Sequence, residues 1–204
     1  MASRDLVRFS YYERLVHWLV GLSFVYLLFS GLAFSHPKLF WVLNLLGGPQ
    51  TARWLHPWLG LVFVAGMVLM FFSFVKDMGI TQKDREWLRA LPHYARLEKD
   101  KVPPSGKYNA GQKGFFWAMV VLTILYLLTG LPLWCPQIFG VGLVPVARFL
   151  HYLVTLPAAL LLLLHVYLGI VLFPGTARSM LYGTVTRAWA KMHHPLWARE
   201  KAGD

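Results

Sequence analysis

The sequence predicts an all-α membrane protein, a bundle of four transmembrane helices with both termini in the cytoplasm. The first observation is the composition: 57% of the 204 residues are hydrophobic and only 14% are charged, too little charge to cover a soluble domain of this size. The second is a set of four uncharged runs of 20 to 25 residues, each long enough to cross a hydrocarbon core. The third is the distribution of the 20 lysines and arginines.

The four uncharged runs define the expected spans, at about residues 15–34, 54–75, 114–135 and 149–173. Residues 1–175 are therefore expected to form one four-helix membrane domain, with a charged cytoplasmic loop over residues 76–113. Residues 176–204 are expected to form a cytoplasmic tail with amphipathic helical spacing as far as Pro195. No cleavable signal is expected, because the first span is too long for a signal and lacks a small-residue cleavage pattern.

The basic residues set the expected orientation. Three precede the first span, nine lie between the second and third, and five follow the fourth, which leaves three on the opposite side. Because lysine and arginine collect in cytoplasmic loops, the termini and the middle loop are expected in the cytoplasm. The net charge of +11 then reflects topology and contact with lipid headgroups, and no nucleic-acid partner is expected.

Two connecting segments have recognisable roles. The connection between the first two spans contains Trp41 and ends at Trp54, and tryptophans favour the membrane–water interface. In the cytoplasmic loop, Trp87, Leu88 and Leu91 are expected near one face of a short helix with charges around them. Such a helix suits the membrane surface or the docking of a soluble partner.

The eight histidines fall into two groups. Four lie in loops or the tail and are expected to be solvated or interfacial: His36, His93, His193 and His194. The other four lie inside or at the edges of the spans, where ionisable side chains are costly and usually functional: His17, His56, His151 and His165.

The histidines within the spans are expected to meet in two pairs. Fourteen residues of α-helix turn the chain by nearly four full turns and advance it by about 21 Å, so His151 and His165 share one face at two depths. The alternating direction of the spans puts His17 at the depth of His165, and His56 at the depth of His151. The spacing therefore predicts two histidine pairs near opposite surfaces of the membrane.

Paired imidazoles with no carboxylate in any span favour two b-type haems. Zinc prefers three or four ligands, and a proton relay normally uses Asp or Glu as well, whereas haem iron needs only two axial ligands. The single cysteine, Cys135, cannot form a disulfide within the chain, and covalent haem attachment is excluded because no CxxCH motif is present. The expected ligand pairs are therefore His17 with His165 and His56 with His151.

Glycine follows three of these histidines at the fourth position, in "HWLVG", "HPWLG" and "HVYLG". Position i+4 lies one turn along the same helix face, so Gly21, Gly60 and Gly169 would leave room for a flat macrocycle. Glycine also aids plain helix packing in membranes. His151 departs from the pattern because Thr155 stands at its fourth position.

The four histidines, the segment "GKYNAGQK" before the third span and the tail "VTRAWAKMHHPLW" together resemble the cytochrome b (gamma) subunit of membrane-bound respiratory formate dehydrogenases. The resemblance covers nearly the whole chain and implies two haem b groups on four helices in the bacterial cytoplasmic (inner) membrane. It also implies an iron–sulfur (beta) subunit docked on the outer side, a molybdenum or tungsten catalytic (alpha) subunit beyond it, and reduction of quinone near the cytoplasmic haem.

Carried onto this sequence, the resemblance implies a quinone site at Asn109 and Gly111 with His165 beside them. The residues themselves agree: Asn109 and Gln112 offer amide donors to a quinone oxygen, and Gly111 permits a close approach of backbone and ring. Lys113 is expected to hold a haem propionate or to lie among headgroups. The segment can also be read as a polar turn that caps the third span.

The function expected from these observations is electron transfer from a periplasmic iron–sulfur and formate-oxidising partner, through two haem b groups, to menaquinone or ubiquinone on the cytoplasmic side. The chain is then an electron-transfer and quinone-reducing subunit without formate chemistry of its own. The alternatives are a cytochrome b subunit of a hydrogenase or sulfur-compound reductase, a haem-free histidine-bearing transporter, and a plain membrane anchor, which has no need of paired histidines.

Overall fold

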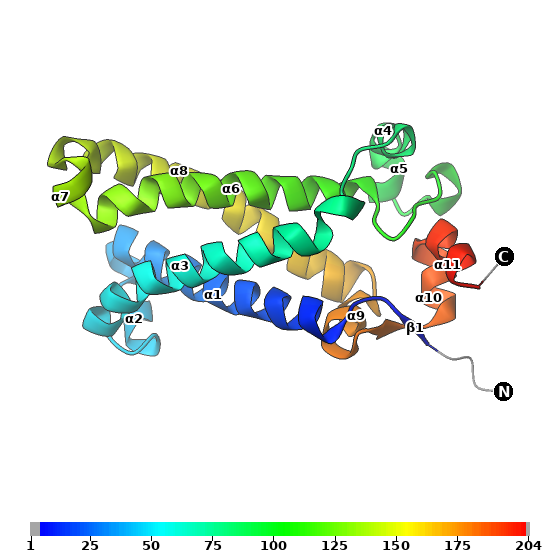
Figure 1. Ribbon diagram of the computed structural model, residues 1–204, viewed down its shortest axis with the longest axis horizontal. Helices are drawn as coiled ribbons and strands as arrows, with labels where there is room; N and C mark the ends of the chain where they lie inside the picture. The colour runs from blue at the N-terminus through cyan, green and yellow to red at the C-terminus, as the bar shows by residue number, and fades with distance from the viewer. Residues whose placement is uncertain (1–4, 203–204) are drawn as a thin grey trace. The chain divides into compact units, whose positions relative to one another are not determined.

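Four long apolar helices dominate the computed structural model, which describes residues 5–202 apart from the side chain of Lys99. They are α1 (Tyr11–Ser35), α3 (Pro49–Phe74), α6 (Ala110–Trp134) and α8 (Val144–Val166) (Figure 1). All four are long and apolar enough to cross a membrane. This confirms the predicted four-helix membrane protein, while the side of the membrane on which the termini lie remains a prediction.

Each long helix begins four or five residues before the uncharged run that predicted it. The added first turns carry polar or charged side chains, among them Glu13 in α1, Lys113 in α6 and Arg148 in α8. Prolines inside α3, α6 and α8 do not end these helices, as is usual in membrane helices, where neighbouring groups satisfy the freed carbonyl.

Short elements connect the long helices. The first connection contains the 3₁₀ turn η1 (Pro37–Leu39) and α2 (Val42–Leu45). After α3, η2 (Val75–Asp77) leads to α4 (Gln82–Arg89), α5 (Leu91–Ala95) and η3 (Lys99–Lys101). The third connection contains α7 (Pro136–Phe139) and η4 (Val141–Leu143). After α8 come a π-helical turn, η5 (Tyr167–Leu172), then α9 (Thr176–Tyr182), α10 (Arg187–His193) and α11 (Pro195–Ala202).

The chain divides into two compact units, each described separately below. The bundle unit comprises residues 15–71 and 119–165, and the terminal unit comprises residues 1–14, 72–118 and 166–204. The bundle unit contains most of the four long helices, and the terminal unit contains their remaining turns, the 72–118 loop and the tail.

Close side-chain packing joins the helices of the bundle unit. A Cβ atom added at Gly66 of α3 would lie 2.7 Å from Cγ2 of Val20 of α1, so the Val20 side chain fills the space that glycine leaves free. Phe24 packs on Phe63 at 5.4 Å between ring centroids. Many large apolar side chains of the same helices are exposed, as expected for side chains that face lipid.

The terminal unit is closed by a short antiparallel ladder that the sequence did not suggest. Strand β1 (Leu6–Val7) pairs with β2 (Thr184–Val185), with Leu6 opposite Val185. Beside it, Val185 joins Trp189, Ala190, Trp197 and Ala198 in a buried apolar cluster. The guanidinium of Arg8 lies 4.8 Å from the ring centre of Trp189 and donates to the Lys107 carbonyl. These contacts tie the N-terminal segment, the loop and the tail together.

Candidate functional site

The bundle unit brings together the two predicted histidine pairs. The ring centroids of His17 on α1 and His165 on α8 lie 6.0 Å apart, and those of His56 on α3 and His151 on α8 lie 6.5 Å apart. Within residues 5–202, no three side chains of His, Cys, Asp or Glu gather into a metal-binding group. The geometry therefore offers two imidazoles at each position, and their role as ligands remains a prediction.

The separation within each pair fits two ligands on one metal ion. Histidine nitrogens bind metals at about 2 Å, which puts two opposed imidazole centroids about 6 Å apart. Ring packing alone also gives centroid distances of about 4.5–7 Å, so the surroundings of the rings must decide whether the residues fit haem b.

The surroundings of His56 and His151 favour a ligand role. His56 Nδ1 lies 2.7 Å from the Ser30 hydroxyl, and His151 Nδ1 lies 2.8 Å from the Thr129 hydroxyl. A histidine that binds a metal through one ring nitrogen usually hydrogen-bonds through the other. Because both hydrogen bonds use Nδ1, the Nε2 atom of each ring remains to bind a metal ion.

The other pair has a different environment. His17 Nδ1 is buried and has no hydrogen-bond partner among the described residues, while His165 is exposed in the chain taken alone. His17 therefore lacks, within the described part of the chain, the Nδ1 hydrogen bond that supports a ligand role for His56 and His151.

The glycines beside the histidines also agree with a flat cofactor. A Cβ atom added at Gly21, Gly60 or Gly169 would meet nothing within 4 Å, so there is room on the helix face one turn after the histidine. The glycines that lie next to the imidazoles are two others, which the sequence pattern did not indicate. Cβ atoms added at Gly31 and Gly130 would lie 3.5 Å from Cε1 of His56 and His151 respectively.

The residues predicted to bind quinone cap the start of α6. The Asn109 side-chain oxygen accepts from the Gln112 backbone N–H at 2.9 Å, and the Gln112 side-chain oxygen accepts from the Asn109 N–H at 3.0 Å. This reciprocal arrangement is a capping box. It uses both amide oxygens but leaves the Gln112 NH₂ group available as a donor. Of the four predicted quinone-site residues, Asn109, Gly111 and Gln112 lie together at this turn. His165 belongs to the other compact unit.

Aromatic side chains surround the same turn. A Cβ atom added at Gly111 would lie 3.3 Å both from Asn109 Oδ1 and from Cη2 of Trp87, so a larger residue would need these neighbours to shift slightly. Burial raises the pKa of the Tyr94 hydroxyl, and its hydrogen bond with Asn109 acts in the opposite direction. Trp87 is buried, whereas Leu88 and Leu91 are exposed, so these three side chains do not share the single face that the sequence suggested.

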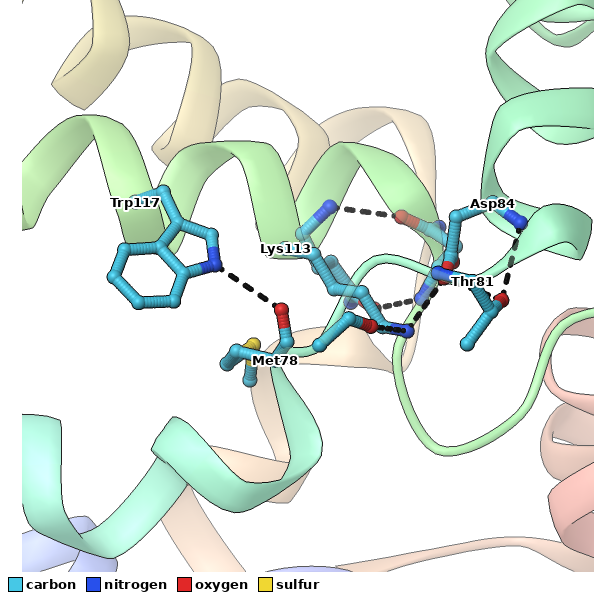
Figure 2. Close-up of polar contacts among 8 residues, drawn as sticks. Met78, Thr81, Asp84, Lys113 and Trp117 are labelled. Atoms are coloured by element: carbon cyan, nitrogen blue, oxygen red, sulfur yellow. Dashed lines mark hydrogen bonds and ion pairs between the residues drawn. The ribbon is translucent and has the colours of Figure 1, made fainter.

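Lys113 does not have the role expected from the sequence. It is buried, its ammonium lies 2.7 Å from Asp84 Oδ2, and it donates to the Gly79 carbonyl at 2.8 Å (Figure 2). Burial raises the pKa of the Asp84 carboxyl, but the hydrogen bonds from Lys113 and Thr81 outweigh burial and leave this pKa below its usual value. Lys113 thus anchors α4 to α6, and its expected place at a propionate or among headgroups is wrong.

Three of the four remaining histidines are partly or largely exposed, and His194 is not. His36 caps η1, with its Nδ1 accepting from the Lys38 N–H, and His93 contacts Glu98. His194 is 2% exposed, with Nδ1 2.7 Å from the Gly106 carbonyl. Burial, and then the charge of Arg8, lower its pKa to about 3. The expectation of a solvated or interfacial His194 is therefore wrong.

Comparison with known proteins identifies the family of this chain. The profile of a protein family described as prokaryotic cytochrome b561 matches residues 8–183. The formate dehydrogenase cytochrome b556(fdo) subunit of Escherichia coli (strain K12) is 35% identical over 204 residues, covering 98% of this chain and 95% of that protein. The nitrate-inducible cytochrome b556(Fdn) subunit of the same organism is 34% identical over 201 residues, covering 97% and 92%.

A third relative, the formate dehydrogenase cytochrome b556 subunit of Haemophilus influenzae, is 33% identical over 198 residues, covering 92% of this chain and 80% of that protein. These matches confirm the resemblance found in the histidines, the loop and the tail, and cytochrome b membership implies haem b. The chain belongs to the prokaryotic cytochrome b561 family of electron-transport proteins and, with its four apolar helices, is a multi-pass protein of the bacterial inner membrane.

Proposed function

We propose that this chain is the di-haem cytochrome b subunit of a formate dehydrogenase complex and carries electrons across the membrane to quinone. The observation that carries the proposal is the presence of two histidine pairs, with ring centroids 6.0 and 6.5 Å apart. Helix α8 provides one histidine of each pair. The names of the relatives as formate dehydrogenase cytochrome b556 subunits supply the reaction.

The ligands proposed for one haem b are His56 and His151, and those for the other are His17 and His165. Haem b bound at these positions would supply two one-electron redox centres. Because His151 and His165 are 14 residues apart on one helix, the two positions are separated by about 21 Å along its axis. The four imidazoles thus hold two centres at different depths, as electron transfer across a membrane requires.

Orientation follows from the basic residues. With the termini and the 76–113 loop in the cytoplasm, the His56–His151 pair lies toward the periplasm and the His17–His165 pair toward the cytoplasm. Each electron that moves inward across the bilayer does so against a field worth about 2.3 kcal/mol per 100 mV. Protons taken from the cytoplasm at the quinone add to this charge separation.

The quinone, either menaquinone or ubiquinone, is proposed to bind beside the capping box of α6. Gln112 has an NH₂ donor that the capping box does not use, and Asn109 has one that faces Tyr94. Such donors suit a carbonyl that becomes more negative as it accepts electrons. Glycine at position 111 keeps the turn compact enough for Trp87 to pack on it.

The proposed partners are an iron–sulfur (beta) subunit on the periplasmic side and a molybdenum or tungsten catalytic (alpha) subunit beyond it. The names of the relatives support a place in such a complex. A hydrogenase or a sulfur-compound reductase would use the same haems with another donor subunit, and identifying the proteins that co-purify with this chain separates these cases.

The proposal is tested by reduced-minus-oxidised absorption spectra of the purified protein together with haem quantitation. Wild-type protein is expected to contain two b-type haems. His151→Ala should remove one of them and His17→Ala the other, while His36→Ala, which changes an exposed loop histidine, retains both. Absence of b-type bands after haem-replete expression would leave the haem-free transporter as the better reading. Equal loss of both haems in every span variant would indicate a folding role for these histidines.

A further inference from the structure

Beside each histidine of one pair lies a serine or threonine that is followed by glycine, on α1 for His56 and on α6 for His151. On α1, the Ser30 hydroxyl lies 2.7 Å from His56 Nδ1, and the adjacent Gly31 would place a Cβ atom 3.5 Å from Cε1 of the same ring. Ser30 is fully buried. The Ser30 hydroxyl therefore holds the His56 ring by a hydrogen bond, and Gly31 leaves space free beside the same ring.

The same arrangement recurs on α6. The Thr129 hydroxyl lies 2.8 Å from His151 Nδ1, and Gly130 would place a Cβ atom 3.5 Å from Cε1 of that ring. Thr129 is 6% exposed. Two different helices thus provide the same hydrogen bond, with an adjacent glycine, to the two histidines of this pair.

A backbone carbonyl accepts the hydrogen of each hydroxyl, and this indicates which partner donates in the bond to the histidine. The Ser30 hydroxyl donates to the Tyr26 carbonyl at 2.8 Å, and the Thr129 hydroxyl donates to the Leu125 carbonyl at 2.7 Å. A hydroxyl has a single hydrogen, so toward the imidazole each oxygen accepts and the Nδ1–H of the histidine donates. This tautomer leaves the lone pair on Nε2, the nitrogen that can bind iron.

One ring of the other pair, that of His17, lacks such a hydrogen bond, because its Nδ1 is buried without a hydrogen-bond partner among the described residues. A hydrogen bond donated by the distal ring nitrogen makes an imidazole a more basic ligand, and a more basic ligand stabilises ferric over ferrous iron, which is one of the levers that set a haem potential.

We infer that Ser30 and Thr129 are positioning residues that fix the tautomer of His56 and His151 and lower the reduction potential of the haem at this pair. The inference rests on the proposed function, since it concerns haem b held by these histidines.

The test uses the purified full-length chain with its haems. Ser30→Ala and Thr129→Val each remove one hydroxyl, and Thr129→Val keeps the side-chain volume, so it carries the test even if Ser30→Ala fails to assemble. The matched controls are Ser23→Ala and Thr123→Val. Both control hydroxyls are buried on the same helices but hydrogen-bond to their own backbone, at Leu19 and Met119.

The readouts are the two midpoint potentials from redox titration of the absorption spectrum and the low-spin ferric EPR signals, with His151→Ala used to assign one potential to its pair. Each hydroxyl variant should raise the potential of the His56–His151 haem and alter its EPR signal, with the other haem unchanged. Thr129→Ser should restore both values, and the controls should not move them.

Two results would overturn the inference. One is wild-type potentials in Thr129→Val with both haems retained, and the other is an equal shift of both haems, which would indicate a general change in the bundle. Failure of the proposed function looks different, because the wild-type protein would then show no b-type haem to titrate.

Discussion

At the scale of single residues, the hydrogen bonds to His56 and His151 come from side chains that the sequence did not indicate. The four histidines of the spans could be chosen because an ionisable group in an apolar run is costly. Ser30 and Thr129 could not, because serine and threonine in membrane helices usually bond to their own backbone. Their second role depends on how α1 and α6 are rotated about their axes, which residue spacing alone does not give.

The quinone proposal can be tested at two amides of the α6 capping box. Gln112→Glu and Asn109→Asp keep the oxygens that cap the helix, and acidic residues suit a helix N-terminus, but they remove the NH₂ donors. Both variants should slow quinone reduction at least several-fold in steady-state assays of the assembled complex, with the haem spectra unchanged.

Gln82→Glu, the same chemical change at the first position of α4, is the control for added negative charge and should have no effect. Unchanged quinone kinetics in Gln112→Glu and Asn109→Asp would reduce this segment to a helix cap.

At the scale of elements, the long helices and their approximate positions were predictable, while the contacts between elements, apart from the histidine pairs, were not. The uncharged runs predicted the four spans. The periodicity of the tail predicted a helix as far as Pro195, and α10 ends at His193. The pairing of β1 with β2 was missed because each strand has only two residues, too few for an alternating pattern. The orientation of α4 was missed because Trp87 packs inward on Gly111 instead of joining Leu88 and Leu91.

The tight packing of Val20 against Gly66 supplies a prediction about stability. Gly66→Ala would place a Cβ atom 2.7 Å from Cγ2 of Val20, and a β-branched side chain has little freedom to move aside. Such overpacking typically costs about 1–3 kcal/mol. We expect a lower thermal midpoint and less haem in the purified protein.

Gly142→Ala provides the control for this prediction, because its added Cβ atom would meet nothing within 4 Å. Equal thermal midpoints for the two variants would show that α1 and α3 can separate without cost.

At the scale of the whole molecule, the terminal unit is held by contacts between segments far apart in sequence. Arg8 lies against Trp189, and burial lowers its pKa to about 10. His194 hydrogen-bonds to Gly106, and the Leu196 N–H donates to the Ser105 carbonyl at 3.2 Å. The tail is therefore an integral part of this unit, and it is docked on the loop that leads into α6.

The burial of His194 makes this unit sensitive to acid. Its pKa is about 3 in the folded protein against 6.5 for a free histidine, so the unfolded state takes up the proton first as the pH falls. The stability that the neutral His194 ring contributes is complete above pH 6.5 and is lost progressively as the pH falls toward about 3. His194→Asn keeps a donor toward Gly106 without a titrating ring, so its thermal midpoint should depend less on pH than that of the wild type.

Thermal unfolding followed by tryptophan fluorescence between pH 7 and pH 4 measures this difference. His36→Asn, at an exposed histidine, should retain the slope of the wild type. If His194→Asn retains that slope as well, the acid sensitivity arises elsewhere in the protein.

The β1–β2 ladder also bears on biosynthesis. Since the partner of Leu6 is Val185, the first strand has nothing to pair with while the ribosome is making the four hydrophobic segments. It can be completed only after the last of these has been translated and delivered to the bilayer. Closure of the ladder thus requires all four hydrophobic segments to have been translated, and a product that stops before Thr184 leaves its N-terminal strand unpaired.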